Sequence, residues 1–264
     1  MLSADDNLAA KATQGLDAFP EARVVVAPDL VLVDSGLPCD TFNIVCRARF
    51  TSATARMRVA EAIAFFRVTG HPWSWWLMPG YTPAELPDAL VEAGLAPAES
   101  EVAMSMGLGE PAPAEPVAGL DIRRVTTAAD LEAFAMLSAA NWDPPDRHVR
   151  RFYRTAGSRF LAPDFPRQLF LGVFEGQPVA TAEFAGSGST AGLYGISTRA
   201  DSRRRGIGTA MTASALNAVR ASGYHRAVLQ AAPDGVGIYT RLGFVAEGEI
   251  VEYKPPAGPL AVSL

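Results

Sequence analysis

The 264-residue sequence is poor in cysteine and histidine, with only two cysteines and three histidines. Two cysteines in a chain of this length make neither a disulfide framework nor a zinc site, so Cys39 and Cys46 are expected to be ordinary packing residues. The three histidines are far apart in the sequence and lack the spacing of metal ligands. The sequence therefore gives no reason to expect a metal.

Long apolar runs and a basic excess are also lacking. No stretch reaches the about 20 apolar residues that span a bilayer, and the first residues lack the basic and apolar regions of a signal peptide. A formal net charge of −5 argues against general nucleic-acid binding, which requires a basic surface. The 49% hydrophobic and 19% charged residues are typical of a folded globular protein. We expect a cytoplasmic protein that binds neither nucleic acid nor membrane.

The segment 193–208 combines an apolar strand, a polar turn and the start of a helix. From Thr209 onward, apolar residues recur at helical spacing, so a loop and a helix N-terminus meet at Gly206. Such a corner has unpaired backbone N–H groups and the positive end of a helix dipole, which together attract an anion. Gly206 and Gly208 have no side chains to obstruct a phosphate. The sequence predicts a phosphate or pyrophosphate ligand here.

Two motifs in the second half point to one family. Arg203-Arg204-Arg205-Gly206-Ile207-Gly208 resembles the acyl-CoA pyrophosphate loop of the GNAT family of N-acetyltransferases. Tyr239-Thr240-Arg241-Leu242-Gly243-Phe244 resembles the Tyr-x-x-Leu-Gly-Phe segment of the same family. The order expected from Leu120 to Tyr253 is strand, helices, two antiparallel strands, strand, helix, strand, helix, strand, which is similar to that of GNAT domains. The resemblance implies acetyl-CoA as co-substrate.

The resemblance also implies roles for individual residues. The pantetheine arm of acetyl-CoA would pair with the strand before the phosphate loop, with the N–H of Ile196 or Ser197 near the thioester oxygen. Tyr239 matches the family's proton donor to the departing thiolate, and its alternative is a core tyrosine. The expected cofactor-binding residues are Ile196, Ser197, Thr198, Arg203, Arg204, Arg205, Gly206, Ile207, Gly208 and Thr209.

The general base has several candidates. Glu183 lies on the strand next to the phosphate-loop strand, where partial burial would make its carboxylate a better base; the alternative is a surface glutamate. Asp143 and Asp146, after the first helix of this half, are weaker candidates. The basic cluster within 147–154 is either a solvated helix face or a contact for an acidic group.

The first half repeats this pattern without the phosphate loop. Phe42-Asn43-Ile44 and Ala93-Gly94-Leu95 correspond to Tyr194-Gly195-Ile196 and Leu242-Gly243-Phe244 at a nearly constant offset of roughly 150 residues. Nothing within 47–54 resembles Arg-x-x-Gly-x-Gly, so acetyl-CoA is expected to bind only the second half.

Two further expectations concern the first half. The polar, alanine-rich N-terminus predicts a helix over 7–16 that packs on the first domain. The strand over 73–78 carries Trp73, Trp75 and Trp76, which are either core residues or one wall of a substrate cleft.

The predicted fold is α/β, with two GNAT-like modules, each a mixed, mostly antiparallel sheet flanked by helices. Residues 1–110 are expected to form a degenerate GNAT-like domain, 111–119 a proline-rich linker, and 120–264 the catalytic domain. The resemblance implies an N-acyltransferase that moves an acetyl group to the amine of a small molecule or peptide by direct attack in a ternary complex. The alternative is a non-catalytic acyl-CoA binding or sensing protein. We expect a monomer or a homodimer.

Overall fold

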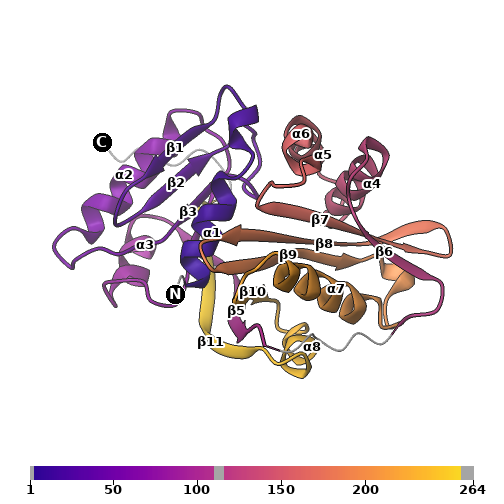
Figure 1. Cartoon of the computed structure of the whole chain (residues 1–264). Helices are drawn as coiled ribbons and strands as arrows, with labels where there is room; N and C mark the ends of the chain where they lie inside the picture. The colour runs from indigo at the N-terminus through magenta and orange to yellow at the C-terminus, as the bar shows by residue number, and fades with distance from the viewer. Residues whose placement is uncertain (1–2, 110–115, 257–264) are drawn as a thin grey trace.

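The structure of the protein, a computed structural model, describes residues 3–109 and 116–256. Within these residues, eleven strands form one continuous sheet with helices packed on it (Figure 1). The strand order is β1-β2-β3-β4-β11-β5-β10-β9-β8-β7-β6, and most neighbouring pairs are antiparallel. This confirms the predicted α/β class. No helix in the described part of the chain has the length and apolar character needed to cross a membrane.

The first half contains three helices and five strands among its described residues, and its helix from Ala55 to Arg67 agrees with the sequence pattern. One face of that helix buries Val59, Ile63 and Phe66, which recur at helical spacing. The elements are α1 (Ala4–Thr13), β1 (Arg23–Val26), β2 (Val31–Asp34), β3 (Ile44–Cys46), α2 (Ala55–Arg67), β4 (Ser74–Leu77), α3 (Leu86–Glu92) and β5 (Ala96–Gly107).

The second half follows the order expected from the sequence. Its described elements are β6 (Leu120–Arg124), α4 (Ala128–Ala139), α5 (Arg147–Thr155), α6 (Gly157–Leu161), β7 (Arg167–Phe174), β8 (Gln177–Ser187), β9 (Thr190–Thr198), α7 (Ile207–Ala221), β10 (Arg226–Ala231), α8 (Val236–Arg241) and β11 (Val245–Lys254). Helix α7 lies along one face of β8 and β9, and α4, α5 and α6 lie near β7 and β8 (Figure 1).

The two halves exchange strands at the centre of the sheet. Strand β5 comes from the first half in sequence, yet it lies antiparallel between β10 and β11 of the second half. Strand β11, in turn, pairs with β4 of the first half. The two halves of the sequence are therefore interleaved in the sheet. The division into 1–110 and 120–264 stays a prediction, and most of the predicted linker (110–115) lies outside the described residues.

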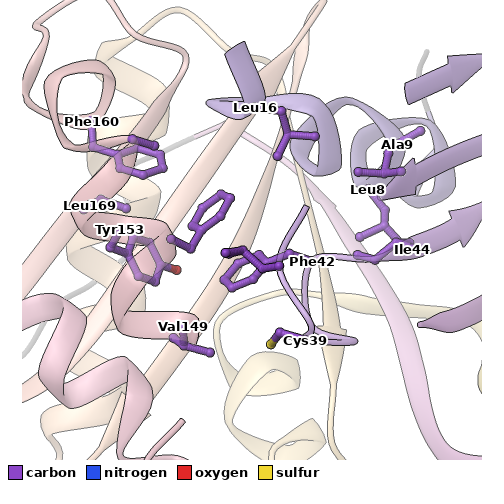
Figure 2. Close-up of a cluster of buried hydrophobic side chains, with 14 of the residues drawn as sticks. Leu8, Ala9, Leu16, Cys39, Phe42, Ile44, Val149, Tyr153, Phe160 and Leu169 are labelled. Carbon is purple, nitrogen blue, oxygen red and sulfur yellow. The ribbon is translucent and has the colours of Figure 1, made fainter. Parts of the chain in front are cut away.

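An apolar core also joins the two halves (Figure 2). Phe42, in the loop before β3, stacks on Phe152 of α5 with ring centroids 3.9 Å apart and an interplanar angle of 11°. Phe19 stacks on the same Phe152 ring at 5.4 Å. Buried aromatic pairs of this kind contribute about 0.5–1.5 kcal/mol beyond the burial of their area. The halves are therefore packed together, and not only connected by the chain.

Helix α1 packs on the first half, as expected, and also on β8 and β9 of the second half. Asn7 is fully buried, and its side-chain amide donates to the carbonyl oxygen of Ala185 at 3.0 Å. Its Oδ1 accepts from the Tyr194 hydroxyl at 2.8 Å. A buried amide without such partners would destabilise the fold, so these bonds fix α1 against β8 and β9. The alanine-rich helix has only a weak apolar pattern, which does not specify the sheet that it covers.

Trp73 and Trp75 are core residues, which was the first of the two interpretations offered for the strand over 73–78. They are 3% and 0% exposed, and Phe66 of α2 stacks on Trp73 with ring centroids 4.7 Å apart. Trp76 points to the opposite face, where it is half-buried against the core between the halves. Cys39 and Cys46 are both buried and unbonded to one another, in agreement with a packing role.

Candidate functional site

The main cleft of the second half forms where β9 separates from β10. These parallel strands pair from Thr190↔Arg226 to Leu193↔Leu229, whereas β9 continues to Thr198. A register shift in the pairing of β8 with β9 and a left-handed Gly195 (φ 56°) mark the bend. Beyond Leu193, the edge of β9 that faced β10 is unpaired within the described chain. Its backbone groups can pair with an extended ligand, which would add to the sheet like another strand.

The phosphate loop stands at the end of this edge. Gly206 adopts a left-handed conformation (φ 79°) before α7, and no side chain caps the helix in the described structure. The N–H groups of the first turn are therefore available to an anion, which the helix dipole also attracts. A Cβ atom built on Gly208 would approach nothing nearer than Thr198 Oγ1, at 3.9 Å, so the space before the helix is open. The Arg203 Nε donates to the carbonyl oxygen of Thr198 at 3.0 Å and steadies the loop.

The strand edge and the loop line one cleft of about 860 Å³, which is within the range of about 300–1,000 Å³ that is usual for small-molecule sites. Nine of the ten predicted cofactor-binding residues line it: Ile196, Ser197, Thr198, Arg203, Arg204, Gly206, Ile207, Gly208 and Thr209. Arg205 does not, because its guanidinium lies over the Phe174 ring, 5.3 Å from the centroid. The predicted residues thus lie along one cleft, except for Arg205, whose side chain packs on Phe174 instead.

Tyr239 lies in the same cleft, on α8. Its ring packs edge to face on Phe244, with centroids 6.0 Å apart. Burial, together with the negative charges of Glu101 and Asp234, raises the pKa of Tyr239 to about 12. The hydroxyl is therefore protonated at neutral pH and can donate a proton to an anion that forms in the cleft.

Glu183 is not among the residues that line this cleft, and the alternative of a surface glutamate is wrong because it is 1% exposed. The Arg167 guanidinium donates to both of its carboxylate oxygens, at 2.8 and 2.9 Å. The Tyr153 hydroxyl donates to it at 3.1 Å, and Lys11 of α1 lies 3.9 Å away. Through these contacts, Glu183 of β8 links α1, α5 and β7.

The other candidates from the sequence also lie outside the cleft lining. Asp146 caps α5 by accepting from the His148 N–H at 2.6 Å and also accepts from the Cys39 thiol at 3.2 Å. In the basic cluster, Arg150 and Arg154 pair with Glu132 on an exposed helix face, which favours the solvated interpretation. Within the described ranges, no group of three or more His, Cys, Asp and Glu side chains is placed to hold a metal ion.

Sequence reasoning missed Glu101. It lies on β5, contributed by the half that lacks the phosphate loop, and it lines the cleft together with Tyr194 and Gln230. Burial, followed by the charges of Glu99 and Glu252, raises the pKa of Glu101 to about 7, against an opposing effect of Lys11. No local motif marks this residue, since only the exchange of β5 between β10 and β11 brings it to the cleft.

The corresponding position in the first half is filled by the chain itself. After β3, Arg47 adopts a left-handed conformation (φ 60°), and the next residues pair with Thr82. The Phe50 N–H donates to the Thr82 carbonyl oxygen at 2.9 Å, and the Thr82 N–H donates to the Ala48 carbonyl oxygen at 3.3 Å. The backbone of β3 pairs with β4, and the residues that follow β3 pair with Thr82, whereas the edge of β9 is open.

Comparisons with known proteins agree with this geometry. Residues 132–244 match the model of the family described as Acetyltransferase (GNAT) family. Among solved structures, a GCN5-related N-acetyltransferase from Kribbella flavida has a TM-score of 0.74 and 23% identity, with 98% of both chains covered. Another from Sphaerobacter thermophilus has a TM-score of 0.60 and 17% identity, covering 87% of this chain and 81% of its own.

A tandem protein of the same fold is also similar over the full length. This tandem GNAT protein from the clavulanic acid biosynthesis pathway has a TM-score of 0.59 and 14% identity, with 98% of both chains covered. At these identities the likeness concerns the fold, and it supports the two-module description. No protein with a curated description matches the chain.

Proposed function

We propose, from the match of residues 132–244 to the GNAT acetyltransferase family, that the protein is an acetyl-CoA-dependent N-acyltransferase. The acceptor is the amine of a small molecule or peptide, which attacks directly in a ternary complex. The observation that carries the proposal is that an open strand edge, an uncapped helix N-terminus and a protonated tyrosine line one cleft.

Each end of the cleft has residues suited to one part of acetyl-CoA. The N–H groups at the start of α7, together with Arg203 and Arg204, would hold the pyrophosphate. The unpaired edge of β9 from Ile196 to Thr198 would hold the pantetheine arm by backbone hydrogen bonds. The first half offers neither an open edge beside β3 nor a phosphate loop, so we propose one acetyl-CoA site per chain.

The reacting groups follow from this arrangement. Attack of the amine nitrogen on the thioester carbonyl carbon forms the C–N bond and places negative charge on the carbonyl oxygen, which the N–H of Ile196 or Ser197 would stabilise. As the C–S bond breaks, the Tyr239 hydroxyl would give its proton to the thiolate sulfur. The amine must also lose a proton, and a base in the cleft has to accept it.

Calorimetric titration with acetyl-CoA, followed by a thiol-release assay with a panel of amines, tests the proposal. We expect one binding site per chain and loss of binding in Gly208→Trp, because an indole would fill the space before α7. Gly107→Trp is the matched control, since Gly107 lies at the exposed end of β5 with nothing within 4 Å of an added Cβ. Unchanged affinity and stoichiometry in Gly208→Trp would refute the site. Binding without thiol release for any amine would favour a non-catalytic acyl-CoA sensor.

A further inference from the structure

Strand β5 brings a carboxylate of the first half into the cleft of the second half. Between β10 and β11, it pairs with β10 through Val102↔Ala231 and with β11 through Glu101↔Ile250 (Figure 1). Side chains alternate along a strand, so Glu101 is on the same face as Ala103, whose partner on β10 is Gln230. Glu101 and Gln230 therefore line the cleft from neighbouring strands.

We propose that Glu101 is the general base of the acetyl transfer, the group that takes the proton from the attacking amine. The proposal rests on the acetyltransferase function given above. In the balanced step, the C–N bond forms and the C–S bond breaks. The amine proton passes to the Glu101 carboxylate, and the Tyr239 proton passes to the sulfur of CoA, so that no other reactant is needed.

The position of Glu101 suits it to work with Tyr239. Both line the cleft, and the charge of Glu101 is one reason why the pKa of Tyr239 is raised to about 12. Glu101 itself is half-buried, and burial is the main reason why its pKa is raised to about 7. A carboxylate that titrates near neutral pH is a stronger base than an exposed one, whereas the tyrosine stays an acid. The two environments thus separate the acid from the base.

The groups around Glu101 also favour an amine as its partner. Glu99 is two residues away on the same face of β5, and Glu252 of β11 is opposite Glu99. These two carboxylates raise the pKa of Glu101, while Lys11 of α1 opposes them. Their negative charge stabilises the positive charge that develops on the nitrogen as the neutral amine attacks. Glu101 accepts one proton from that nitrogen.

The other carboxylates are less suited to this task. Glu183 is held by Arg167, Tyr153 and Lys11 and is absent from the cleft lining. Asp234 lines the cleft but is exposed in the loop before α8, where water solvates it. If Glu101 is the base, the half without a phosphate loop contributes a catalytic residue, and the exchange of β5 becomes part of the active site.

The experiment uses the full-length chain and the variants Glu101→Gln and Glu249→Gln. We expect Glu101→Gln to lower kcat/KM for acetyl transfer by about 100-fold or more, the usual scale of general acid–base catalysis, and to leave the Kd for acetyl-CoA within about twofold. Glu249→Gln, which changes an exposed carboxyl of β11 outside the cleft lining, should stay within about threefold of the parent in kcat/KM. Full kcat/KM in Glu101→Gln, or loss of acetyl-CoA binding with it, would overturn the proposal.

A pH profile separates a catalytic role of Glu101 from a structural one. With an arylamine acceptor that is neutral over the whole range, kcat/KM of the parent chain should rise with pH through a midpoint near 7, because Glu101 must be ionised to accept a proton. The rise should vanish in Glu101→Gln. The role of Glu101 would be overturned if the rise of kcat/KM with pH persists in Glu101→Gln. It would also be overturned if the rise is lost in Glu183→Gln instead, or if the parent chain shows no rise.

Failure of the two proposals can be told apart. If the parent chain binds acetyl-CoA but transfers acetyl to no amine of the panel, the proposed function fails and the role of Glu101 fails with it. If the parent chain transfers acetyl and Glu101→Gln does so equally well, only the role of Glu101 fails.

Discussion

Arg167 and Glu183 form an ion pair that is almost completely buried, with both side chains 2% exposed and Arg167 Nη2 only 2.8 Å from Glu183 Oε2. The pair lies beside the aromatic rings of Phe152, Tyr153 and Phe160. In such surroundings a charge without a partner is strongly unfavourable, because it has lost its water. The ion pair therefore holds Glu183 of β8 against Arg167 of β7.

Loss of this pair should destabilise the fold more than it impairs the chemistry. We expect Glu183→Gln to lower the free energy of unfolding by about 3–5 kcal/mol, because Arg167 keeps a buried charge without a countercharge. Urea denaturation at neutral pH measures the change. Glu132→Gln, which breaks the exposed pair with Arg150, is the control and should cost less than about 1 kcal/mol. Equal effects of the two substitutions would contradict this account.

Tyr239→Phe should separate binding from catalysis. If the hydroxyl protonates the departing thiolate, its removal lowers kcat by about 100-fold while the Kd for acetyl-CoA stays nearly unchanged, since the contact matters mainly in the transition state. The ring still packs on Phe244, so the thermal midpoint should move little. Single-turnover kinetics make the chemical step visible. An unchanged rate of that step would remove Tyr239 from the mechanism.

Glu101 should also leave a signature in the pH dependence of stability. Its pKa is about 7 in the folded chain against an ordinary value of 4.5, so the folded state favours the protonated form. Stability from this group is therefore present at low pH and is lost as the pH rises from 4.5 through 7.

The variant Glu101→Gln, which mimics the protonated carboxyl, makes this visible. It should match the parent chain near pH 4 and be more stable above pH 7 by at most about 3 kcal/mol. Glu249→Gln, which changes an exposed carboxyl of β11, should show no such growing difference. Thermal melts of the three chains across this pH range provide the test, and a constant offset between parent and Glu101→Gln would contradict it.

Local features were predictable from the sequence, and long-range ones were not. The predicted phosphate loop, the segment around Tyr239 and the repeat could be recognised because each rests on short-range spacing, and nine of the ten residues predicted to bind the cofactor line one cleft. The partners of β5 could not be found in this way. An alternating strand buries its apolar residues equally well against a strand of either half, so the pattern does not specify the exchange.

The same limit explains what the sequence left out at single residues. Glu183 was a candidate base because its strand was placed correctly beside β9, but its partner Arg167 is contributed by another strand and is invisible in local spacing. Helix α1 was assigned to the first half, which it does contact, but its bonds from Asn7 to Ala185 and Tyr194 of the second half were not foreseen. Glu101 was missed because its own half carries no motif.

The interleaved sheet predicts that the two halves remain together after the chain between them is cut. A protease site introduced within 110–115 leaves β5 on one piece and β10 and β11 on the other. Because β5 pairs with both of these strands and Phe42 stacks on Phe152, we expect the cut protein to elute as one species and to bind acetyl-CoA with unchanged affinity. Analytical gel filtration and calorimetry check both points.

By contrast, a fragment that starts near Val117 lacks β5 and leaves the edges of β10 and β11 unpaired, so it should bind acetyl-CoA only after the first piece is added back. Full binding by that fragment alone would show that the second half does not need the exchanged strand.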